Sequence, residues 1–342
     1  MPKGLINTPL DVRSGTPPAD PAVMSASAEM SAPVVMSAPA VMSAPMLDAL
    51  VPRDMARHAE TIGVAKANLS ATSTIALGIL AGAFISFGAM LATVVTAGGE
   101  LPFGVSRLLG GLVFSLGLVL VAVGGAELFT GNNLIVMAFA SRRITFAALA
   151  RNWVLVYFAN FFGAVFTALL VFWSGQYRSG TGAIGRRALE VAQTKSSLSV
   201  REAVFLGILA NILVCLAVWL CLAARSVADK VLAIVGPITA FVAAGFEHSI
   251  ANMYFLPFGV VVKRWASPSF WTSIHAKPED FPHVGWSKFF LSNLLPVTIG
   301  NMIGGVGMVG LVYWFIYLRP ARGDPAPERS DLSAAVPSPP PE

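Results

Sequence analysis

Long stretches without a single charged residue constrain the fold of this chain more than any other feature. Four of them hold 33, 26, 22 and 30 residues, and they run over positions 67–99, 152–177, 203–224 and 289–318. A helix needs roughly 20 apolar residues to cross the hydrocarbon core of a bilayer. Only 12% of the residues are charged and 55% are hydrophobic, whereas a typical soluble domain has about a quarter charged residues. The sequence therefore predicts an integral membrane protein.

Two further apolar tracts are interrupted by ionisable residues. Glu127 divides the tract 108–141, and Glu247 and His248 divide the tract 231–262. A charged group at the centre of a membrane helix costs about 2.5–3.5 kcal/mol on insertion scales, so it usually lines a functional path. Glycines flank both interruptions, and discontinuous helices whose free backbone groups face a cavity would satisfy these constraints. We therefore expect an all-α protein with six transmembrane helices, of which the second and the fifth are broken at the midplane.

The remaining segments divide the chain further. The unbroken spans are expected over about residues 69–97, 151–174, 203–224 and 287–318. Residues 1–46 are rich in Ala, Pro and Ser and residues 320–342 are rich in Pro, so both tails are expected to be disordered. Residues 47–67 combine helically spaced apolar side chains with charged ones, which is typical of an amphipathic helix at the membrane interface. The six-span transmembrane pore domain would then occupy residues 68–319.

The two halves of this domain repeat three motifs in the same order. These are Leu-Gly-Ile-Leu-Ala at 77–81 and 206–210; Gly125, Glu127 and Asn132 against Gly245, Glu247 and Asn252; and Asn152, Asn160 and Gly163 against Asn293, Asn301 and Gly304. Three spans separate the corresponding elements, so the halves must cross the membrane in opposite senses. The sequence thus predicts two inverted three-helix repeats with a site near the midplane.

Several classes of function are disfavoured. The formal net charge of +5 comes from Lys and Arg residues at the ends of the spans, where they meet lipid headgroups, so we expect membrane lipid and no nucleic acid as a partner. Cys215 and Cys221 are six positions apart in one tract, which suits neither a disulfide framework nor a metal pair. Among four histidines only His248 lies in a span. We therefore expect no cofactor, no metal site and no enzymatic activity.

The orientation is only weakly encoded. Lys and Arg are nearly balanced between the two sides, so the positive-inside rule does not decide. Arg142, Arg143 and Arg151 lie around one short loop. They favour a cytoplasmic position for that loop and for both termini, with the protein in the inner (plasma) membrane.

Three segments resemble signatures of the formate/nitrite transporter family. They are Glu127-Leu-Phe-Thr-Gly-Asn132, Gly245-Phe-Glu-His-Ser-Ile-Ala-Asn-Met253 and Asn293-Leu-Leu-Pro-Val-Thr-Ile-Gly-Asn-Met-Ile-Gly-Gly305. The resemblance extends over about residues 47–319, and the segments 270–271 and 278–281 look more like the formate branch. It implies an aquaporin-like fold, a homopentamer with one pore in each protomer, and bidirectional, pH-dependent conduction of formate or a similar small monovalent anion.

The resemblance also implies roles for individual residues. They are a central His248; apolar constrictions at Phe114, Leu118 and Phe241; a loop between half-helices at Leu128, Phe129 and Thr130 that opens or closes the path; Asn301 facing the histidine; and a vestibule lysine at Lys195. The long N-terminal tail departs from the family pattern.

A central histidine makes chemical sense in such a pore. Moving a carboxylate into a medium of low dielectric constant costs on the order of 20 kcal/mol in the idealised limit. Protonating formate at pH 7 costs only about 5 kcal/mol if its pKa is similar to that of an α-carboxyl. Histidine is the side chain whose unperturbed pKa suits such proton loans. The alternative is a neutral core histidine bonded to a backbone carbonyl, but the place of His248 beside Glu247 in a helix break favours function.

The other candidate residues have structural alternatives. Glu247 either orients His248 or caps a half-helix, and Glu127 is expected to brace the first break. Phe114 and Phe241 are gates or core aromatics, and Phe241 is expected on the same helical face as His248, two turns away. Thr130 is interpreted as an N-cap, compatible with donation to His248.

Two further residues carry expectations of their own. Gly131 is expected at a turn with positive φ. Lys195, in a polar loop with Arg178, Arg186, Arg187 and Arg201, contacts headgroups or attracts anions.

Other substrates stay open. A nitrite or hydrosulfide channel of the same family is the first alternative. An aquaporin-like channel for neutral solutes shares the inverted repeat, but the sequence lacks its paired Asn-Pro-Ala boxes.

Overall fold

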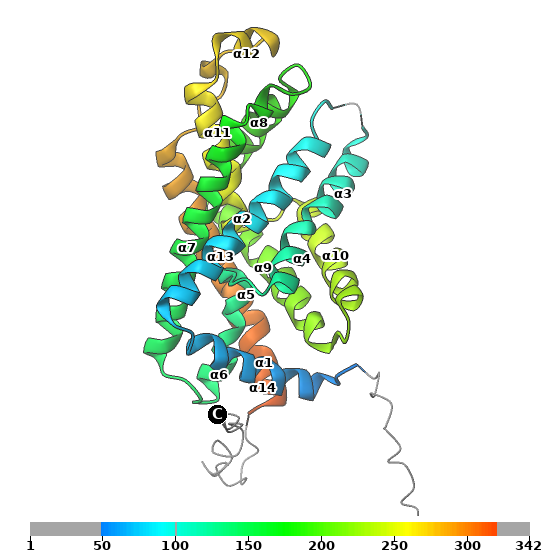
Figure 1. Ribbon diagram of the computed structural model, residues 1–342, viewed down its shortest axis with the longest axis vertical. Coiled ribbons are helices and arrows are strands. Elements are labelled where there is room, and N and C mark those ends of the chain that lie inside the picture. The colour runs from blue at the N-terminus through cyan, green and yellow to red at the C-terminus, as the bar shows by residue number, and fades with distance from the viewer. Residues whose placement is uncertain (1–48, 100, 320–342) are drawn as a thin grey trace, which may run out of the picture. The chain divides into compact units, whose positions relative to one another are not determined.

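The computed structural model describes residues 49–99 and 101–319, and these residues are helical apart from short connections (Figure 1). The two tails expected to be disordered, 1–46 and 320–342, lie outside the described residues. The predicted amphipathic helix is present as α1 (Pro52–Ala67).

Six helices of the described chain are long and apolar enough to cross a membrane, which confirms the predicted number of spans. They are α2 (Ala71–Val95); α3 (Phe103–Phe114) continued by α4 (Leu116–Gly124); α7 (Phe146–Trp173); α9 (Val200–Ala223); α10 (Val227–Ala244); and a last span from Lys288 to Tyr317. The predicted limits of the unbroken spans lie within five residues of these bounds.

The last span is not a uniform α-helix. It consists of the π-helix η4 (Lys288–Leu294), α13 (Leu295–Met302), the π-helix η5 (Ile303–Leu311) and α14 (Val312–Tyr317). π-helical turns occur frequently at functional sites. Here they contain Asn293 and Gly304, two members of the repeated motifs.

Shorter elements connect the spans. They are α5 (Phe129–Asn132), η1 (Asn133–Ile135), α6 (Val136–Ala140), η2 (Gln176–Arg178), α8 (Ala183–Ser196), α11 (Ser249–Trp265), α12 (Pro268–Ser273) and η3 (Pro278–Asp280). Both predicted helix breaks are present, one between α4 and α5 and the other between α10 and α11.

The interpretation of the segment before the fourth span as a polar loop is wrong. Residues 183–196 form α8, whose apolar side chains are buried at helical spacing, among them Ile184, Ala188 and Ala192. Arg186 and Thr194 are exposed on its other face, which is the pattern of an amphipathic helix. Its four charged residues indicated a segment outside the membrane, and the helical spacing of its apolar residues was overlooked.

Glycines bring the long helices into close contact. A side chain at Gly82 of α2 or Gly163 of α7 would collide with the backbone of the other helix. A side chain at Gly300 of α13 or Gly304 of η5 would collide with the backbone of α9. Small residues at helix interfaces are typical of membrane proteins, where van der Waals packing drives association. The two closest interfaces are thus built alike in the two halves.

The shorter helices also pack in corresponding ways. α1 contacts α6 and η1, while α8 contacts α11. Each amphipathic helix therefore supports the element that follows a break. In Figure 1 α1, α6 and α14 lie at one end of the membrane unit, and α8 and α12 lie at the other.

Candidate functional site

The first break is held by backbone geometry and by one asparagine. Gly125 follows α4 with φ 72°, a left-handed conformation that residues with a side chain rarely adopt. Asn160 of α7 satisfies the exposed backbone groups. Its Nδ2 donates to the carbonyls of Gly78 and Glu127 at 2.7 and 2.9 Å, and its Oδ1 accepts the N–H of Phe129 at 2.9 Å.

The second break repeats this arrangement. Gly245 has φ 80°. The Nδ2 of Asn301 donates to the carbonyls of Gly207 and Glu247 at 2.8 and 2.9 Å, and its Oδ1 accepts the N–H of Ser249 at 2.9 Å. The side chain of Asn301 is therefore bound to the backbone on either side of the histidine, whereas the resemblance implied that it faces the imidazole.

The carboxylate of Glu127 is buried and paired. Lys66, in the last turn of α1, donates to its Oε1 at 2.8 Å, and Asn132 donates to its Oε2 at 2.7 Å. Asn132 also donates to the Oδ1 of Asn152 at 2.9 Å. This network fixes the polypeptide just after the first break.

Glu247 has an equivalent set of partners. Lys195, in the last turn of α8, donates to its Oε1 at 2.8 Å. Asn252 and Asn293 donate to its Oε2 at 2.7 and 3.1 Å. The geometry favours bracing by Glu247 over orientation of His248, because these bonds hold the carboxylate toward α8 and the last span.

His248 links the two breaks. Its Nδ1 accepts the backbone N–H of Ala251 at 3.1 Å, so the imidazole caps the N-terminus of α11. A ring nitrogen that accepts carries no proton, so the neutral ring carries its proton on Nε2. Nε2 lies 2.9 Å from the Oγ1 of Thr130 and donates to it. The alternative of a core histidine bonded to a backbone carbonyl therefore does not describe this residue.

Two expectations for the first half-helix are wrong. Thr130 is not an N-cap, because Leu128 occupies that position and Thr130 lies inside α5. Gly131 does not have a positive φ, and it too lies inside α5. The left-handed residue of this break is Gly125, six positions earlier, where α4 ends.

A large cavity leads to the imidazole from one side. Its volume is about 990 Å³, and its lining includes His248, Lys195, Arg107 and Arg187. Thr181 and His275 line it as well, so it extends to the end of the membrane unit that carries α8 and α12 (Figure 1). We call it the outer cavity. Its lining contains four Arg and Lys residues, Arg107, Arg186, Arg187 and Lys195, against two carboxylates, Glu190 and Glu247. This excess of positive charge favours anions.

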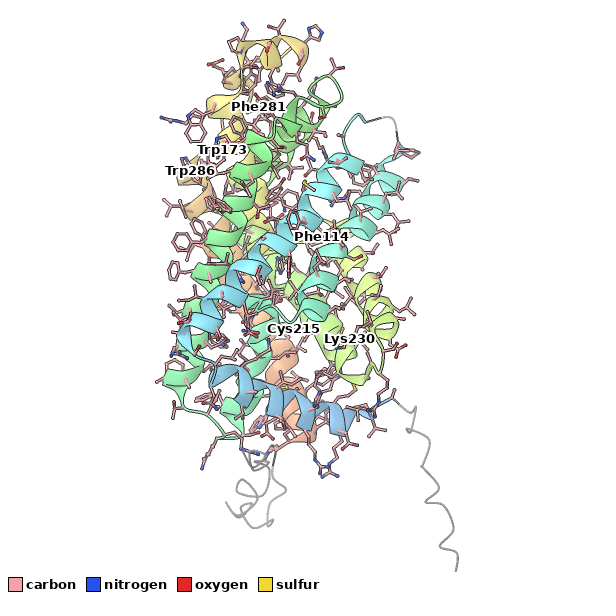
Figure 2. The ribbon with its side chains drawn as sticks, viewed as in Figure 1. Phe114, Trp173, Cys215, Lys230, Phe281 and Trp286 are labelled. Atoms are coloured by element: carbon pink, nitrogen blue, oxygen red, sulfur yellow. The ribbon has the colours of Figure 1, made fainter. Side chains whose placement is uncertain are left out.

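A smaller cavity lies toward α1. Its volume is about 330 Å³, and Lys66, Glu127, Lys230 and Leu128 are among the residues that line it. We call it the inner cavity. Figure 2 shows Phe114, which lines the outer cavity, farther from the α1 end than Lys230. Each cavity thus contains a lysine that is paired with a buried glutamate.

Comparison with known proteins identifies this architecture. The family model described as formate/nitrite transporter matches residues 53–315. The chain belongs to the formate/nitrite transporter family. It is 50% identical over 273 residues to the formate channel FocA of Escherichia coli K12, which covers 80% of this chain and 96% of that relative. It is 39% identical over 264 residues to FocA of Haemophilus influenzae, covering 77% of this chain and 93% of that one.

A solved structure of the family agrees in fold. The structure described as a pentameric formate channel with formate bound has 42% sequence identity and a TM-score of 0.70, over 73% of this chain and 98% of that one. The chain is accordingly a multi-pass membrane protein of this family, and these relatives are formate channels.

The formate/nitrite transporter fold brings two of the predicted gate residues together. The rings of Phe114 and Phe241 meet edge to face with centroids 5.6 Å apart, and both line the outer cavity. Phe241 also lies 5.9 Å from the imidazole of His248. The expectation that Phe241 and His248 share one helical face is wrong. α10 ends at Ala244 and the chain turns before His248, so the contact comes from the turn.

The other predicted gate residues separate into two groups. Leu118 and Leu128 line the inner cavity and are almost fully buried. Phe129 lines neither of the two cavities and stacks edge-on against Tyr157 at 4.9 Å. In this chain, aromatic side chains therefore lie on the outer side of His248 and leucines on the inner side.

Sequence reasoning missed three residues beside the histidine. Arg107 donates from Nε to the carbonyl of Ala243 at 2.9 Å and so caps the end of α10. Asn211 donates to the carbonyl of Asn301 at 2.7 Å. Phe255 lines the outer cavity as well. The Asn211 position, inside an otherwise apolar span, was the one signal available in the sequence.

Proposed function

We propose that this member of the formate/nitrite transporter family is a channel for formate or a similar small monovalent anion. Its relatives in Escherichia coli and Haemophilus influenzae are named formate channels, and the solved neighbour is described with formate bound. These relatives favour formate over nitrite or hydrosulfide. The same relatives are channels by name, which supports transport over enzymatic chemistry.

The pairing of His248 with Thr130 carries this proposal. Both side chains are almost fully buried, and they join the two helix breaks by a 2.9 Å hydrogen bond. On the outer side stand Phe114 and Phe241, and on the inner side stands Leu128. A polar pair between apolar constrictions is the arrangement that a dry path for a small anion requires.

The residues act in sequence on an incoming anion. Lys195 draws it into the outer cavity, and the phenyl rings strip its water. Because Thr130 accepts from His248, its hydroxyl hydrogen is available to the anion. The Nε2 proton of His248 becomes a second donor when the anion replaces the Oγ1 of Thr130 as its acceptor. Hydrogen bonds of this kind offset part of the desolvation cost, on the order of 20 kcal/mol in the idealised limit. Leu118 and Leu128 form the inner gate, and Phe129, next to Leu128 in the chain, supports it by packing against Tyr157. Asn301 positions His248 through the neighbouring backbone.

An anion beside the ring strengthens this assistance in acid, because its negative charge favours the imidazolium, which the buried ring does not form in the empty pore. Protonation of His248 must occur at Nδ1, which then gives up the N–H of Ala251. The resulting imidazolium pairs with a carboxylate and can lend it a proton. Formate flux is therefore expected to rise as the pH falls, in either direction across the membrane.

The assembly and its orientation complete the proposal. The pentameric neighbour supports a homopentamer with one pore in each protomer. Arg143 pairs with Glu60 of α1 at 3.7 Å, so the arginine-rich loop and α1 lie at the same end. We place that end, with both termini, in the cytoplasm, with α1 at the interface of the inner (plasma) membrane.

A flux assay in proteoliposomes tests the function. The purified protein is reconstituted, and the fluxes of formate, nitrite, hydrosulfide, lactate and water are compared with those of protein-free vesicles. We expect formate to give the largest protein-dependent flux among the anions. Faster passage of nitrite or hydrosulfide would assign the chain to the family alternative, and water flux without anion flux would assign it to neutral solutes.

A further inference from the structure

Of the four Arg and Lys residues that line the outer cavity, one has no carboxylate partner. Arg107 makes no ion pair within residues 49–99 and 101–319. The other three cations each lie 2.8–3.7 Å from a carboxylate oxygen. They are Lys195, which pairs with Glu247, and Arg186 and Arg187, which share Glu190. Arg107 is therefore the cation of this cavity that is free to pair with an incoming anion.

Three contacts hold the guanidinium of Arg107 in place. Its Nε donates to the carbonyl of Ala243 at 2.9 Å. Its central carbon lies 5.7 Å from the ring centroid of Phe103, a distance that allows a cation–π attraction. A side chain at Gly245 would collide with Nη2, so this nitrogen lies against the turn of the second break. Neither Nη atom has a hydrogen-bond acceptor in the described part of the chain, so both are available to a ligand.

The turn that contacts this guanidinium also carries the central histidine. Gly245 precedes His248 by three residues, and both line the outer cavity together with Arg107. Phe241 lines it as well, with its ring 5.9 Å from the imidazole. An anion bound to Arg107 therefore lies in the cavity that leads to the phenyl rings and the imidazole.

A second guanidinium acts on the same place. The charged groups near enough to Arg107 to affect it electrostatically include Arg187 of α8 and Glu247. Glu247 is already paired with Lys195, and the Nε of Arg187 donates to the Oγ1 of Thr96 at 3.1 Å. Two like charges that lie near each other repel, and an anion beside both removes part of that repulsion. The surroundings of Arg107 thus favour a bound anion further.

We propose that Arg107 is the docking residue of the outer cavity, which binds the carboxylate of formate through its two Nη atoms before the anion reaches the phenyl rings. The planar fork of a guanidinium matches a carboxylate with two parallel N–H···O hydrogen bonds. Lys195 contributes to the positive field of the cavity, whereas Arg107 forms the contact with the anion. This inference rests on the proposed function and adds the site at which the substrate is first bound.

The test is the formate concentration at which the flux in proteoliposomes is half-maximal. Arg107→Gln keeps an N–H donor for the carbonyl of Ala243 but removes the charge and the fork. We expect the half-maximal concentration to rise roughly tenfold, since hydrogen bonds to a charged group contribute at least that factor, while most of the maximal flux is kept. Arg107→Lys keeps the charge without the fork and should raise the concentration less.

Arg186→Gln is the matched control. It removes the same charge from the lining of the same cavity. Arg186, however, is already bound to the Oε1 of Glu190 at 3.1 Å and to the carbonyl of Ile274 at 3.3 Å. We expect its half-maximal concentration to stay close to that of the wild type.

The outcomes separate docking from a structural role and from the proposed function. A lower maximal flux at an unchanged half-maximal concentration in Arg107→Gln would show that Arg107 only caps α10, and it would overturn the inference. An equal rise in Arg186→Gln would also overturn it, because the overall charge of the cavity would then explain the effect. If Arg107→Gln does not assemble, Arg107→Lys decides, and a half-maximal concentration equal to that of the wild type would reject the fork. A wild-type protein without formate flux would contradict the function instead.

Discussion

Phe241 lines the outer cavity beside the imidazole of His248, and its ring meets that of Phe114 edge to face. At the scale of one residue this ring is the nearest barrier to hydrated ions. We expect Phe241→Ala to open the path enough for hydrated ions to pass, so that selectivity falls and conductance rises in planar bilayers. Conductance and selectivity equal to those of the wild type would mean that Phe241 only packs against the protein.

Lys195 is a second residue with a separable effect. Lys195→Met leaves the buried carboxylate of Glu247 without its cation, and breaking a buried pair in this way costs about 3–5 kcal/mol. We therefore expect a clear fall in the Tm of the purified protein. The double variant Lys195→Met/Glu247→Gln removes both charges and should recover much of the loss. A single variant as stable as the wild type would show that this ion pair does not brace the break.

Among the helices, α1 and α8 share one task although neither spans the membrane. Each carries a lysine in its last turn, Lys66 or Lys195, that pairs with the glutamate of one break. Each also packs on the element that follows that break. The broken helices are thus supported from outside the six spans, and the support is built twice.

The break itself depends on the end of α4, and a matched pair of glycines tests this. Gly125→Ala places a side chain at φ 72°, which costs about 1–2 kcal/mol, with no other atom within 4 Å of the new methyl group. Gly131→Ala meets only a methyl group of Val218 at 3.5 Å, inside a helix. We expect a lower Tm and lower formate flux for Gly125→Ala but not for Gly131→Ala. Equal behaviour of the two variants would contradict the assigned geometry.

For the whole molecule, hydropathy and repetition in the sequence were enough to predict the arrangement of the spans. The six spans and both breaks come from uncharged tracts interrupted by Glu127 and Glu247, because few other structures can contain such residues in a membrane. The correspondence of the breaks was predicted from spacing alone. A hydrogen bond between Thr130 and His248 was considered possible, but the spacing of the repeated motifs did not require it.

The misassigned features depend on tertiary contacts or on local backbone geometry. The lysine partners of the two glutamates come from helices up to 61 residues away, and nothing in the spacing specifies them. Gly125 and Gly131 both lie near Glu127, and the sequence does not tell which of them adopts the left-handed conformation. The hydrogen bonds of Asn160 to the carbonyl of Glu127 and the N–H of Phe129 place the start of α5 before Gly131. Phe255 was invisible among the many phenylalanines of the spans, because exposure to a cavity has no signature in composition.

His248 is the point at which the two halves of the molecule meet, and the proposed mechanism depends on it. The most direct test is formate flux in reconstituted wild type and His248→Asn between pH 5 and 8, with protein-free vesicles as background. Asparagine keeps a donor and can still cap α11, but it cannot become a cation. We expect the wild-type flux to rise as the pH falls, and the flux of His248→Asn to be lower by orders of magnitude without that rise, since each 1.4 kcal/mol of lost assistance is a factor of ten. Water passage need not fall with it. Equal formate fluxes with the same pH profile would contradict the central role of His248.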